Sequence, residues 1–263
     1  MVARTLSRRR KVAFFFDFDG TLAPLVPDPP AARLSLAVSR NLVLLLSLPQ
    51  ARTAIVSGRS LVDLSRRVPL RGLGLAGNHG LEIALPEKTW KHPVVQACAR
   101  PLARLSLRLR QELHGLPGWY LESKGAGLAI HYRHAPPEAI PELFRRVEAV
   151  VGQTQEYSCL RLVKATWTLE IRPAVDWDKG RAVEWILLTW YGADWPLLVL
   201  PVFVGDEATD EDAFRFLGSR GITVKVDHQG CDQKRLTAAQ FTLAGPEEMP
   251  RFLGWWYREC LHA

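Results

Sequence analysis

Two aspartates stand where an apolar run ends near the start of the chain. The segment KVAFFFDFDG places Asp17 and Asp19 directly after residues 12–16, which are apolar or aromatic without alternation. Extended backbone puts side chains two residues apart on one side, so both carboxylates would lie together. They repel one another unless a cation or a shared proton lies between them. Asp206, at the end of another apolar run, would complete an all-oxygen site with water, which suits Mg²⁺.

The same side chains could carry phosphoryl transfer. An ionised aspartate has an ordinary pKa of about 3.9 and needs no base to attack phosphorus, so Asp17 could form an aspartyl phosphate. Asp19 is placed to protonate the leaving oxygen and then to deprotonate water. Thr21 offers a hydroxyl to an anion, Ser57 follows a further apolar run, and Lys179 precedes a helix. Together these donors could neutralise charge on the transferring group.

Each motif also has an ordinary structural interpretation. DFDG alone could be a turn after a strand, and Ser57 or Ser60 could simply cap a helix. Thr209 is a good helix N-cap, and the acidic residues 210–212 would enrich the first turn of that helix. Only the conjunction of several polar clusters at strand ends favours a functional site.

The elements that would position these residues alternate in the first and last parts of the chain. Short apolar strands are expected at 12–16, 52–56, 73–77, 197–204, 222–226 and 241–243. Helices are expected at 31–48, from Ser60 onward, and at 180–191, 209–217 and 246–260. This rhythm predicts an α/β fold with a doubly wound parallel sheet, whose ligands bind beyond the carboxyl ends of the strands.

The middle of the chain has a different rhythm. Helices are expected at 93–114 and 136–151, and strands at 118–124, 127–134, 157–163 and 166–173. The order α-β-β-α-β-β is typical of a separate antiparallel sheet with helices on one face. We therefore expect an inserted α+β domain at 86–172, between the two halves of a core at 1–85 and 173–263.

Composition excludes little but narrows the class. The chain has 263 residues, 48% hydrophobic and 23% charged, with a net charge of +7 that suits acidic partners such as phosphorylated metabolites. Its basic residues form no stripe interleaved with aromatics, so no specific nucleic-acid binding is expected. Its four cysteines show no metal-ligand spacing and indicate reduced thiols in the cytoplasm. No segment predicts a membrane span, and we expect a monomer with a small-molecule sugar phosphate as its partner.

Together, the motifs resemble a known family. The segments DFDGTLAPLVPDP, VSGRS, GNHGLE, ESKGAGLAIHYR, LEIRP, DKG and VGDEATDEDAF are similar to those of trehalose-6-phosphate phosphatases in the haloacid-dehalogenase (HAD) superfamily. The resemblance covers nearly the whole chain. It implies a HAD-like core, a mobile cap formed by the insert, and Mg²⁺-dependent hydrolysis of trehalose 6-phosphate.

The resemblance also implies roles for residues. Asp17 would be the nucleophile and Asp19 the general acid and base. Asp17, the carbonyl of Asp19 and Asp206 would hold the metal, with Asp210 close by. Ser57 and Lys179 would bind the phosphoryl group. Substrate contacts would come from Thr21, Gly58, Arg59, Asn78 and His79 in the core, and from Glu122, Lys124, Arg133 and Glu170 in the cap.

Three alternatives remain at this stage. The same mechanism could act on another ester, such as sucrose phosphate or a nucleotide. The fold could serve as a non-catalytic sensor of sugar phosphates. The basic chain could bind nucleic acid with strongly salt-dependent affinity, although only weak non-specific binding is expected.

The residues expected in the cap also have an ordinary structural interpretation. Without the resemblance, Glu122, Lys124 and Arg133 could be cross-strand ion pairs on an exposed sheet face.

Overall fold

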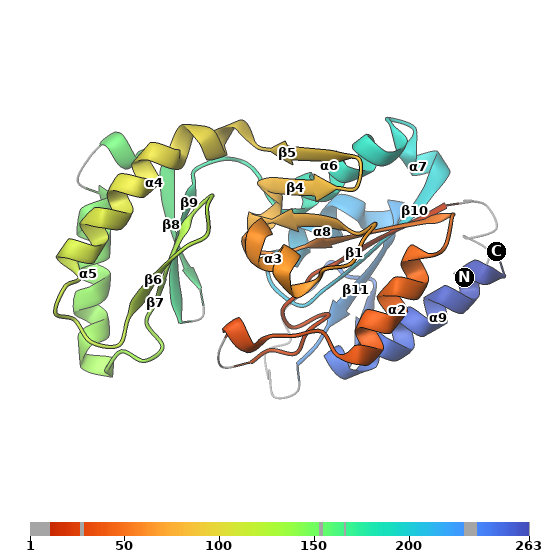
Figure 1. Ribbon diagram of the computed structural model, residues 1–263, viewed down its shortest axis with the longest axis horizontal. Helices are drawn as coiled ribbons and strands as arrows, with labels where there is room; N and C mark the ends of the chain where they lie inside the picture. The colour runs from red at the N-terminus through yellow and green to blue at the C-terminus, as the bar shows by residue number, and fades with distance from the viewer. Residues whose placement is uncertain (1–10, 27–28, 153–154, 166, 229–235, 263) are drawn as a thin grey trace. The chain divides into compact units, whose positions relative to one another are not determined.

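The chain folds into two compact units. The structure is a computed structural model that describes residues 11–26, 29–152, 155–165, 167–228 and 236–262 (Figure 1). Unit 1 comprises residues 1–90 and 177–263, and unit 2 comprises residues 91–176. The boundaries expected from the sequence, 85/86 and 172/173, lie within five residues of these. That the two units are independent domains stays a prediction.

Unit 1 is built on an eight-stranded sheet in the order β12-β11-β10-β1-β2-β3-β4-β5. Its strands are β1 (Lys11–Phe16), β2 (Ala51–Val56), β3 (Gly74–Gly77), β4 (Glu82–Leu85), β5 (Lys88–Lys91), β10 (Val199–Gly205), β11 (Ile222–Val226) and β12 (Phe241–Leu243). The six strands from β12 to β3 pair in parallel, with β1 between β10 and β2. Their carboxyl ends therefore lie at one edge, which confirms the expected doubly wound α/β core.

The unpatterned apolar run of β1 is explained by burial on both faces of the sheet. Phe14 and Phe16 pack in one core with Trp256, while Ala13 and Phe15 pack in a second core. The first core is covered by α2 (Leu36–Leu46) and α9 (Met249–Leu261), and the second by α6 (Lys179–Tyr191) and α8 (Asp210–Leu217). Alternate side chains of one strand thus feed both layers, as a central parallel strand requires.

The structure corrects several expected elements. The hairpin of β4 and β5 was not expected, and β4 runs antiparallel to β3, so the sheet is mixed. The helix expected at 31–48 covers only 36–46, because Ser35 caps it by accepting a hydrogen bond from the Val38 N–H. The strand expected from 197 begins at 199, after the short helix α7 (Trp195–Leu198). Helix α3 (Leu61–Arg67) begins after Ser60, which caps it as expected.

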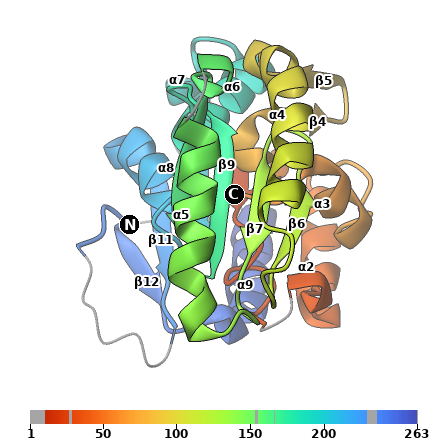
Figure 2. The same ribbon diagram turned by 90° about the vertical axis from the view of Figure 1, so that its left-hand side faces the viewer.

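Unit 2 has its own sheet and its own core. The strands β6 (Tyr120–Ser123), β7 (Leu128–His131), β8 (Leu160–Ala165) and β9 (Thr168–Pro173) pair antiparallel in the order β6-β7-β9-β8. Helices α4 (Pro93–Glu112) and α5 (Ile140–Gly152) cover one face of this sheet (Figure 2). The two layers enclose a single apolar cluster. The α-β-β-α-β-β order is as expected.

Short 3-10 helices complete the chain. They lie at Pro29–Ala31, Asn78–Gly80, Pro137–Ala139, Gln155–Tyr157, Gly218–Arg220 and Pro246–Glu248. None of the helices in the described part of the chain combines the length and the apolar character needed to cross a membrane.

The chain leaves unit 1 and returns to it beside a stack of indoles. Trp90 and Trp177, the residues at the two crossings, have ring centroids 5.1 Å apart. The ring of Trp90 also stacks on Trp185 of α6 at 4.9 Å. Both crossings are thereby anchored to the helix that begins with Lys179.

Candidate active site

A buried lysine links two aspartates from distant parts of the chain. The ammonium of Lys179, at the start of α6, lies 2.6 Å from Asp17 Oδ1 and 2.7 Å from Asp210 Oδ1. Its side chain is fully buried, as is that of Asp210. A bound phosphate would explain a lysine at the start of a helix. In the structure, the carboxylates of Asp17 and Asp210 already explain it, because both pair with the ammonium.

The loop after β10 orders the acidic residues. Asp210 Oδ2 accepts hydrogen bonds from the backbone N–H groups of Asp206 and Glu207, at 3.0 and 2.9 Å. Thr209 was expected to cap α8, but its side chain makes no cap hydrogen bond and instead donates to Glu207. Asp210 therefore closes the turn, and both of its oxygens already accept hydrogen bonds.

Asp206 lies between a hydroxyl and an imidazole. Its Oδ1 accepts a hydrogen bond from Thr21 at 3.0 Å, and its Oδ2 lies 2.9 Å from His228 Nε2. The hydroxyl of Thr21 thus orients Asp206, and the substrate contact expected of Thr21 stays a prediction. Sequence reasoning missed His228, which follows Asp227 just beyond the carboxyl end of the parallel strand β11 (Ile222–Val226). The other site residues were sought at strand ends of this kind.

The acidic group suits a divalent cation. Asp17, Asp206 and Asp210 each offer an oxygen, and these oxygens lie within 4.8 Å of one another. Three carboxylates against one ammonium leave two surplus negative charges. Burial raises the pKa of Asp17 well above its ordinary value, and the charges of Asp210 and Asp206 add to this although Lys179 opposes them. A hard divalent ion with oxygen ligands would relieve this repulsion, so these residues fit Mg²⁺.

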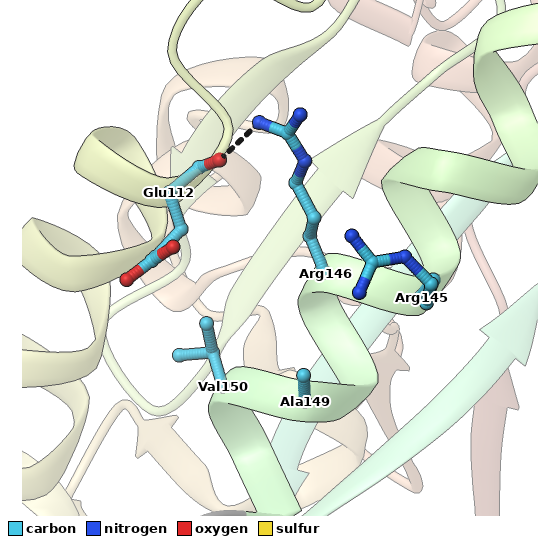
Figure 3. A pocket seen from close by; sticks show the side chains of 5 residues that line it. All are labelled: Glu112, Arg145, Arg146, Ala149 and Val150. Carbon is cyan, nitrogen blue, oxygen red and sulfur yellow. Dashed lines mark hydrogen bonds between the residues drawn. The ribbon is translucent and has the colours of Figure 1, made fainter.

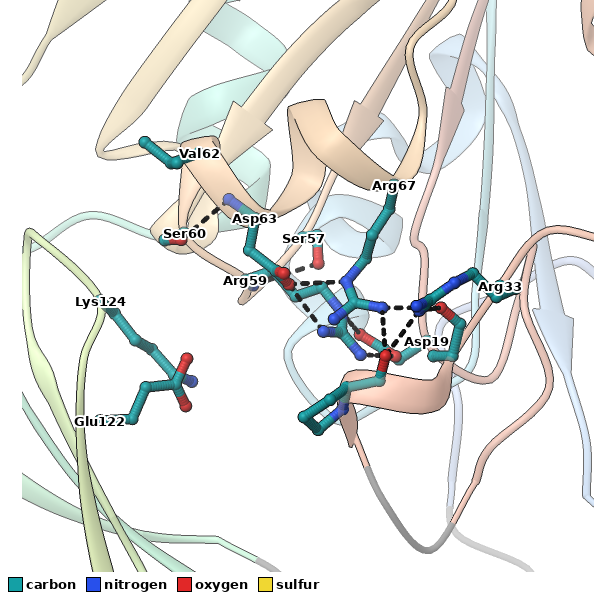
Figure 4. A network of polar contacts seen from close by, with 12 residues as sticks. Asp19, Arg33, Ser57, Arg59, Ser60, Val62, Asp63, Arg67, Glu122 and Lys124 are labelled. Carbon is teal, nitrogen blue, oxygen red and sulfur yellow. Dashed lines mark hydrogen bonds and ion pairs between the residues drawn. The ribbon is translucent and has the colours of Figure 1, made fainter.

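Asp19 has a different partner. Its carboxylate is held by Arg59, with Nε to Oδ2 and Nη2 to Oδ1 both at 2.6 Å (Figure 4). Asp17 and Asp19 were expected to share one cation, but each carboxylate pairs with its own basic side chain. The carboxylate of Asp19 is absent from the acidic group found among the described residues. Whether its carbonyl ligates a metal stays a prediction.

Arg59 is itself held by a second carboxylate. Its Nη1 lies 2.7 Å from Asp63 Oδ2, and Arg67 Nε lies 2.7 Å from the same oxygen. Burial raises the pKa of Asp63, but the hydrogen bonds from Arg67 and Arg59 outweigh it and leave that pKa below its ordinary value. Sequence reasoning missed both Asp63 and Arg67 as parts of the site, because their spacing on α3 is that of an ordinary helical ion pair.

The loops after β2 and β3 are bonded to one another. Ser57 is buried, and its hydroxyl accepts a hydrogen bond from the Arg59 N–H at 3.2 Å. The Asn78 N–H donates to the Arg59 carbonyl and the His79 N–H to the Ser57 carbonyl. A Cβ on Gly58 would lie 2.8 Å from the His79 ring, so the two loops pack closely.

Asn78 and His79 adopt left-handed backbone conformations. Their φ values are 52° and 57°, which side chains rarely adopt. The amide of Asn78 donates to Glu82 Oε2 at 2.9 Å in a buried contact. Substrate contact by Asn78 or His79 is not tested and stays a prediction.

The four site residues expected in unit 2 lie on its sheet or beside it. Lys124 Nζ lies 2.8 Å from Glu170 Oε1, and Arg172 also bonds to Glu170. Glu122 Oε2 lies 2.8 Å from His131 Nε2. Arg133 follows β7, and its role in substrate binding stays a prediction along with those of the other three.

A pocket in unit 2 lies away from these residues. It has a volume of about 310 Å³ and is lined by Glu112, Arg145, Arg146, Ala149 and Val150 (Figure 3). Arg146 Nη1 donates to the Glu112 carbonyl at 2.8 Å. Glu142 pairs with both arginines at 2.7 Å. The two carboxylates of Glu142 and Glu112 balance the charges of the two arginines, so the pocket gives no support for an anion site.

Gly20 makes room for Asp206, which gives a direct test of the site's geometry. Its φ is +83°, and a Cβ there would lie 2.1 Å from Asp206 Oδ2. Gly72 has the same φ but nothing within 4 Å, so it is a matched control. Gly72→Ala should cost about 1–2 kcal/mol for the left-handed backbone alone. Gly20→Ala should cost more and displace Asp206, lowering kcat by at least about tenfold.

Urea denaturation and steady-state kinetics on both variants test this expectation. Equal losses of stability with unchanged kcat would show that Gly20 serves only its own backbone conformation.

The fold and the site identify the class of protein. The chain aligns with a haloacid dehalogenase-like hydrolase from Bacteroides thetaiotaomicron with a TM-score of 0.64 and 15% identity, covering 94% of this chain and 99% of that one. It aligns with the C-terminal domain of trehalose-6-phosphate phosphatase from C. albicans with a TM-score of 0.79 and 24% identity, covering 98% and 95%. The architecture is thus that of the HAD-like hydrolases with an inserted domain.

Sequence comparison gives the family. Residues 15–247 match the model of the trehalose-phosphatase family, to which this chain therefore belongs. A trehalose-phosphate phosphatase of Mycobacterium tuberculosis is 39% identical over 246 residues, which are 92% of this chain and 60% of that protein. The chain thus spans about three fifths of the length of the curated relatives that it matches.

Proposed function

We propose that this chain hydrolyses trehalose 6-phosphate to trehalose and phosphate through an aspartyl phosphate on Asp17. In this proposal it is a cytoplasmic, monomeric phosphoric monoester hydrolase whose partner is the sugar phosphate, with no nucleic acid and no membrane. Membership of the trehalose-phosphatase family supports the substrate. The observation that carries the chemistry is the buried Asp17, fixed by Lys179 at 2.6 Å beside Asp206.

The residues divide the reaction between them. A carboxylate oxygen of Asp17 attacks phosphorus while the bond from phosphorus to the sugar oxygen breaks, and Asp19 gives its proton to that oxygen. Asp19 then takes a proton from the water that cleaves the aspartyl phosphate. Lys179 holds Asp17 in place, and Ser57 and Lys179 are proposed to offer donors to the phosphoryl oxygens.

A magnesium ion would complete the site. Asp17 and Asp206 would supply its carboxylate oxygens and Asp19 its carbonyl, while Asp210 orders the loop that carries Asp206. Bound there, Mg²⁺ would neutralise negative charge on the phosphoryl group and on the carboxylates. In the cap, Glu122, Lys124, Arg133 and Glu170 are proposed to contact the sugar hydroxyls.

A panel of phosphate esters tests this function. Phosphate release should be measured from trehalose 6-phosphate, sucrose 6-phosphate, glucose 6-phosphate and a nucleotide, each with Mg²⁺, with Ca²⁺ and with a chelator. We expect kcat/KM for trehalose 6-phosphate to exceed that for glucose 6-phosphate at least about 100-fold, because a site built for a second ring leaves polar groups unpaired without it. Activity should vanish with the chelator and return with Mg²⁺, but not fully with Ca²⁺, which prefers more ligands at longer distances.

Two outcomes would contradict the proposal. Equal kcat/KM for trehalose and glucose 6-phosphates would remove the substrate assignment and leave a general sugar phosphatase. Full activity after exhaustive chelation would remove the metal.

A further inference from the structure

Arg59 uses three of its nitrogens on two carboxylates. Nε and Nη2 make parallel hydrogen bonds to the two oxygens of Asp19, both at 2.6 Å, and Nη1 bonds to Asp63 at 2.7 Å. Its guanidinium carbon also lies 5.4 Å from the centre of the Phe18 ring. Only 12% of its side chain is exposed, against 27% for Asp19. Both of these carboxylates belong to unit 1.

The second carboxylate is braced in turn. Arg67 donates to Asp63 through Nε and to the carbonyls of Pro30 and Ala32 through Nη1, at 3.1 and 2.7 Å. Asp63 is fixed at its backbone as well, because its N–H donates to the cap residue Ser60. Helix α3 thus holds Asp63 in one place, and Asp63 in turn orients the guanidinium of Arg59.

The backbone of Arg59 is also fixed at both of its polar groups. Its N–H donates to Ser57 Oγ at 3.2 Å, and its carbonyl accepts from the Asn78 N–H at 2.7 Å. Asn78 makes this contact from a left-handed conformation, which costs free energy and persists because the surrounding structure enforces it. The backbone from which the guanidinium extends is therefore fixed by the loops that follow β2 and β3.

We propose that Arg59 is a positioning residue for the base step, holding the carboxylate of Asp19 in a single orientation, rather than a residue that binds the sugar. A bidentate guanidinium–carboxylate pair fixes the plane of the carboxylate, which a single ammonium contact does not. The inference rests on the proposed function. Both oxygens of Asp19 accept hydrogen bonds from Arg59 in the structure, which matches Asp19 after its proton has passed to the leaving sugar oxygen. The carboxylate is then aligned to take a proton from water.

The position of Arg59 in the chemistry makes its loss measurable on two kinds of substrate. Cleavage of the aspartyl phosphate by water is common to every ester, whereas only the sugar phosphate has a disaccharide to bind. A misaligned Asp19 should therefore lower kcat on both trehalose 6-phosphate and p-nitrophenyl phosphate. A lost sugar contact should raise KM for the disaccharide alone.

The experiment compares Arg59→Gln, Arg59→Lys and Asp63→Asn with wild type on these two substrates. We expect Arg59→Gln to lower kcat about 100-fold on both, with KM changed less than about threefold, because misplacement near 1 Å has an effect of this size. Arg59→Lys should recover little of the loss, because it keeps the charge without the fork. Asp63→Asn should lower kcat by about three- to tenfold, because Asp63 orients Arg59 and has no proposed contact with substrate.

The control is Arg66→Gln. Arg66 is an exposed arginine on α3, the helix that carries Asp63, and its replacement should leave both kinetic constants unchanged. Thermal unfolding of all variants separates misfolding from misalignment. Within a cycle of wild type, Arg59→Gln, Asp19→Asn and the double variant, the two single shifts in Tm should not add.

Several results would overturn the inference while the proposed function stands. They are an Arg59→Gln variant with normal kcat on p-nitrophenyl phosphate, a fully active Arg59→Lys variant, and additive shifts in Tm. A wild-type chain that hydrolyses p-nitrophenyl phosphate but not trehalose 6-phosphate removes the proposed substrate and leaves the kcat test of Arg59 intact. A wild-type chain that hydrolyses neither ester overturns both proposals.

Discussion

Replacing Asp17 by Asn should lower kcat by at least about 10⁴-fold, the loss seen when an enzyme is deprived of its nucleophile. The amide has nearly the shape of the carboxylate but cannot form the acyl phosphate. Lys179 keeps its contact with Asp210 at 2.7 Å, so the ammonium does not lose every partner. The fold should therefore survive a change that removes turnover.

Stability should respond in the opposite direction to activity. The pKa of Asp17 is raised by burial well above its ordinary 3.8, so folding favours the protonated form. The stability that this proton provides is fully present below pH 3.8 and is lost as the pH rises through the raised, folded-state value. At pH 7 in metal-free buffer the wild-type protein has lost this stabilisation, whereas the Asn variant has no carboxyl group at position 17 to lose a proton. The free energy of unfolding of Asp17→Asn should therefore match that of wild type or exceed it by about 1–2 kcal/mol.

Urea denaturation in chelator, with parallel turnover assays, tests both halves of this prediction. Asp212→Asn on α8 is the control, because Asp212 is a half-exposed carboxylate paired with Arg215 and should change neither quantity by much. Turnover above about 1% of wild type in Asp17→Asn would contradict the nucleophile assignment.

Lys179→Met should be the most destabilising single change in the site. The ammonium is completely buried between Asp17 and Asp210, and its removal leaves two buried carboxylates facing one another without a cation. Breaking a buried ion pair in this way costs about 3–5 kcal/mol, although methionine fills much of the volume. Turnover should also fall by at least about 10³-fold, because Asp17 is no longer held in place.

The same substitution at Lys225 gives the comparison. Lys225 lies 3.7 Å from Asp227, whose side chain is 54% exposed, so Lys225→Met should cost no more than about 1 kcal/mol. Chemical denaturation of the two variants measures the difference. Equal losses of stability would show that the buried cluster contributes nothing beyond an ordinary surface pair.

Much of the fold was accessible from the sequence because its signals are local. Short contiguous apolar runs such as 12–16 favour buried strands, and both β1 and β2 lie where those runs stand. The hairpin of β4 and β5 escaped prediction because β5 is largely exposed and carries no apolar pattern. Helix α7 escaped because Leu197 and Leu198 extend the apolar run of the following strand, yet both are exposed.

The sequence predicted which residues gather at the candidate site better than which of them pair with one another. Residues at the carboxyl ends of parallel strands must gather at one edge, which brought Asp17 and Asp206 together as expected. Lys179 joins them from the first position of α6. Which carboxylate pairs with which basic side chain depends on the order of the strands in the sheet. The strands β1 and β2 are neighbours in the sheet, although α2 separates them along the chain. The pair of Asp19 and Arg59, forty residues apart, therefore could not be deduced from spacing.

The indole stack at the two crossings makes the insert modular. Because the Trp90 and Trp177 rings are 5.1 Å apart, everything between them departs from and returns to nearly one point on the surface of unit 1. The entropy of closing that loop depends only weakly on its length. Unit 1 can accordingly accommodate inserts of very different size at this point with little change in its own free energy of folding, which is the physical condition for exchanging one inserted unit for another while unit 1 keeps its fold.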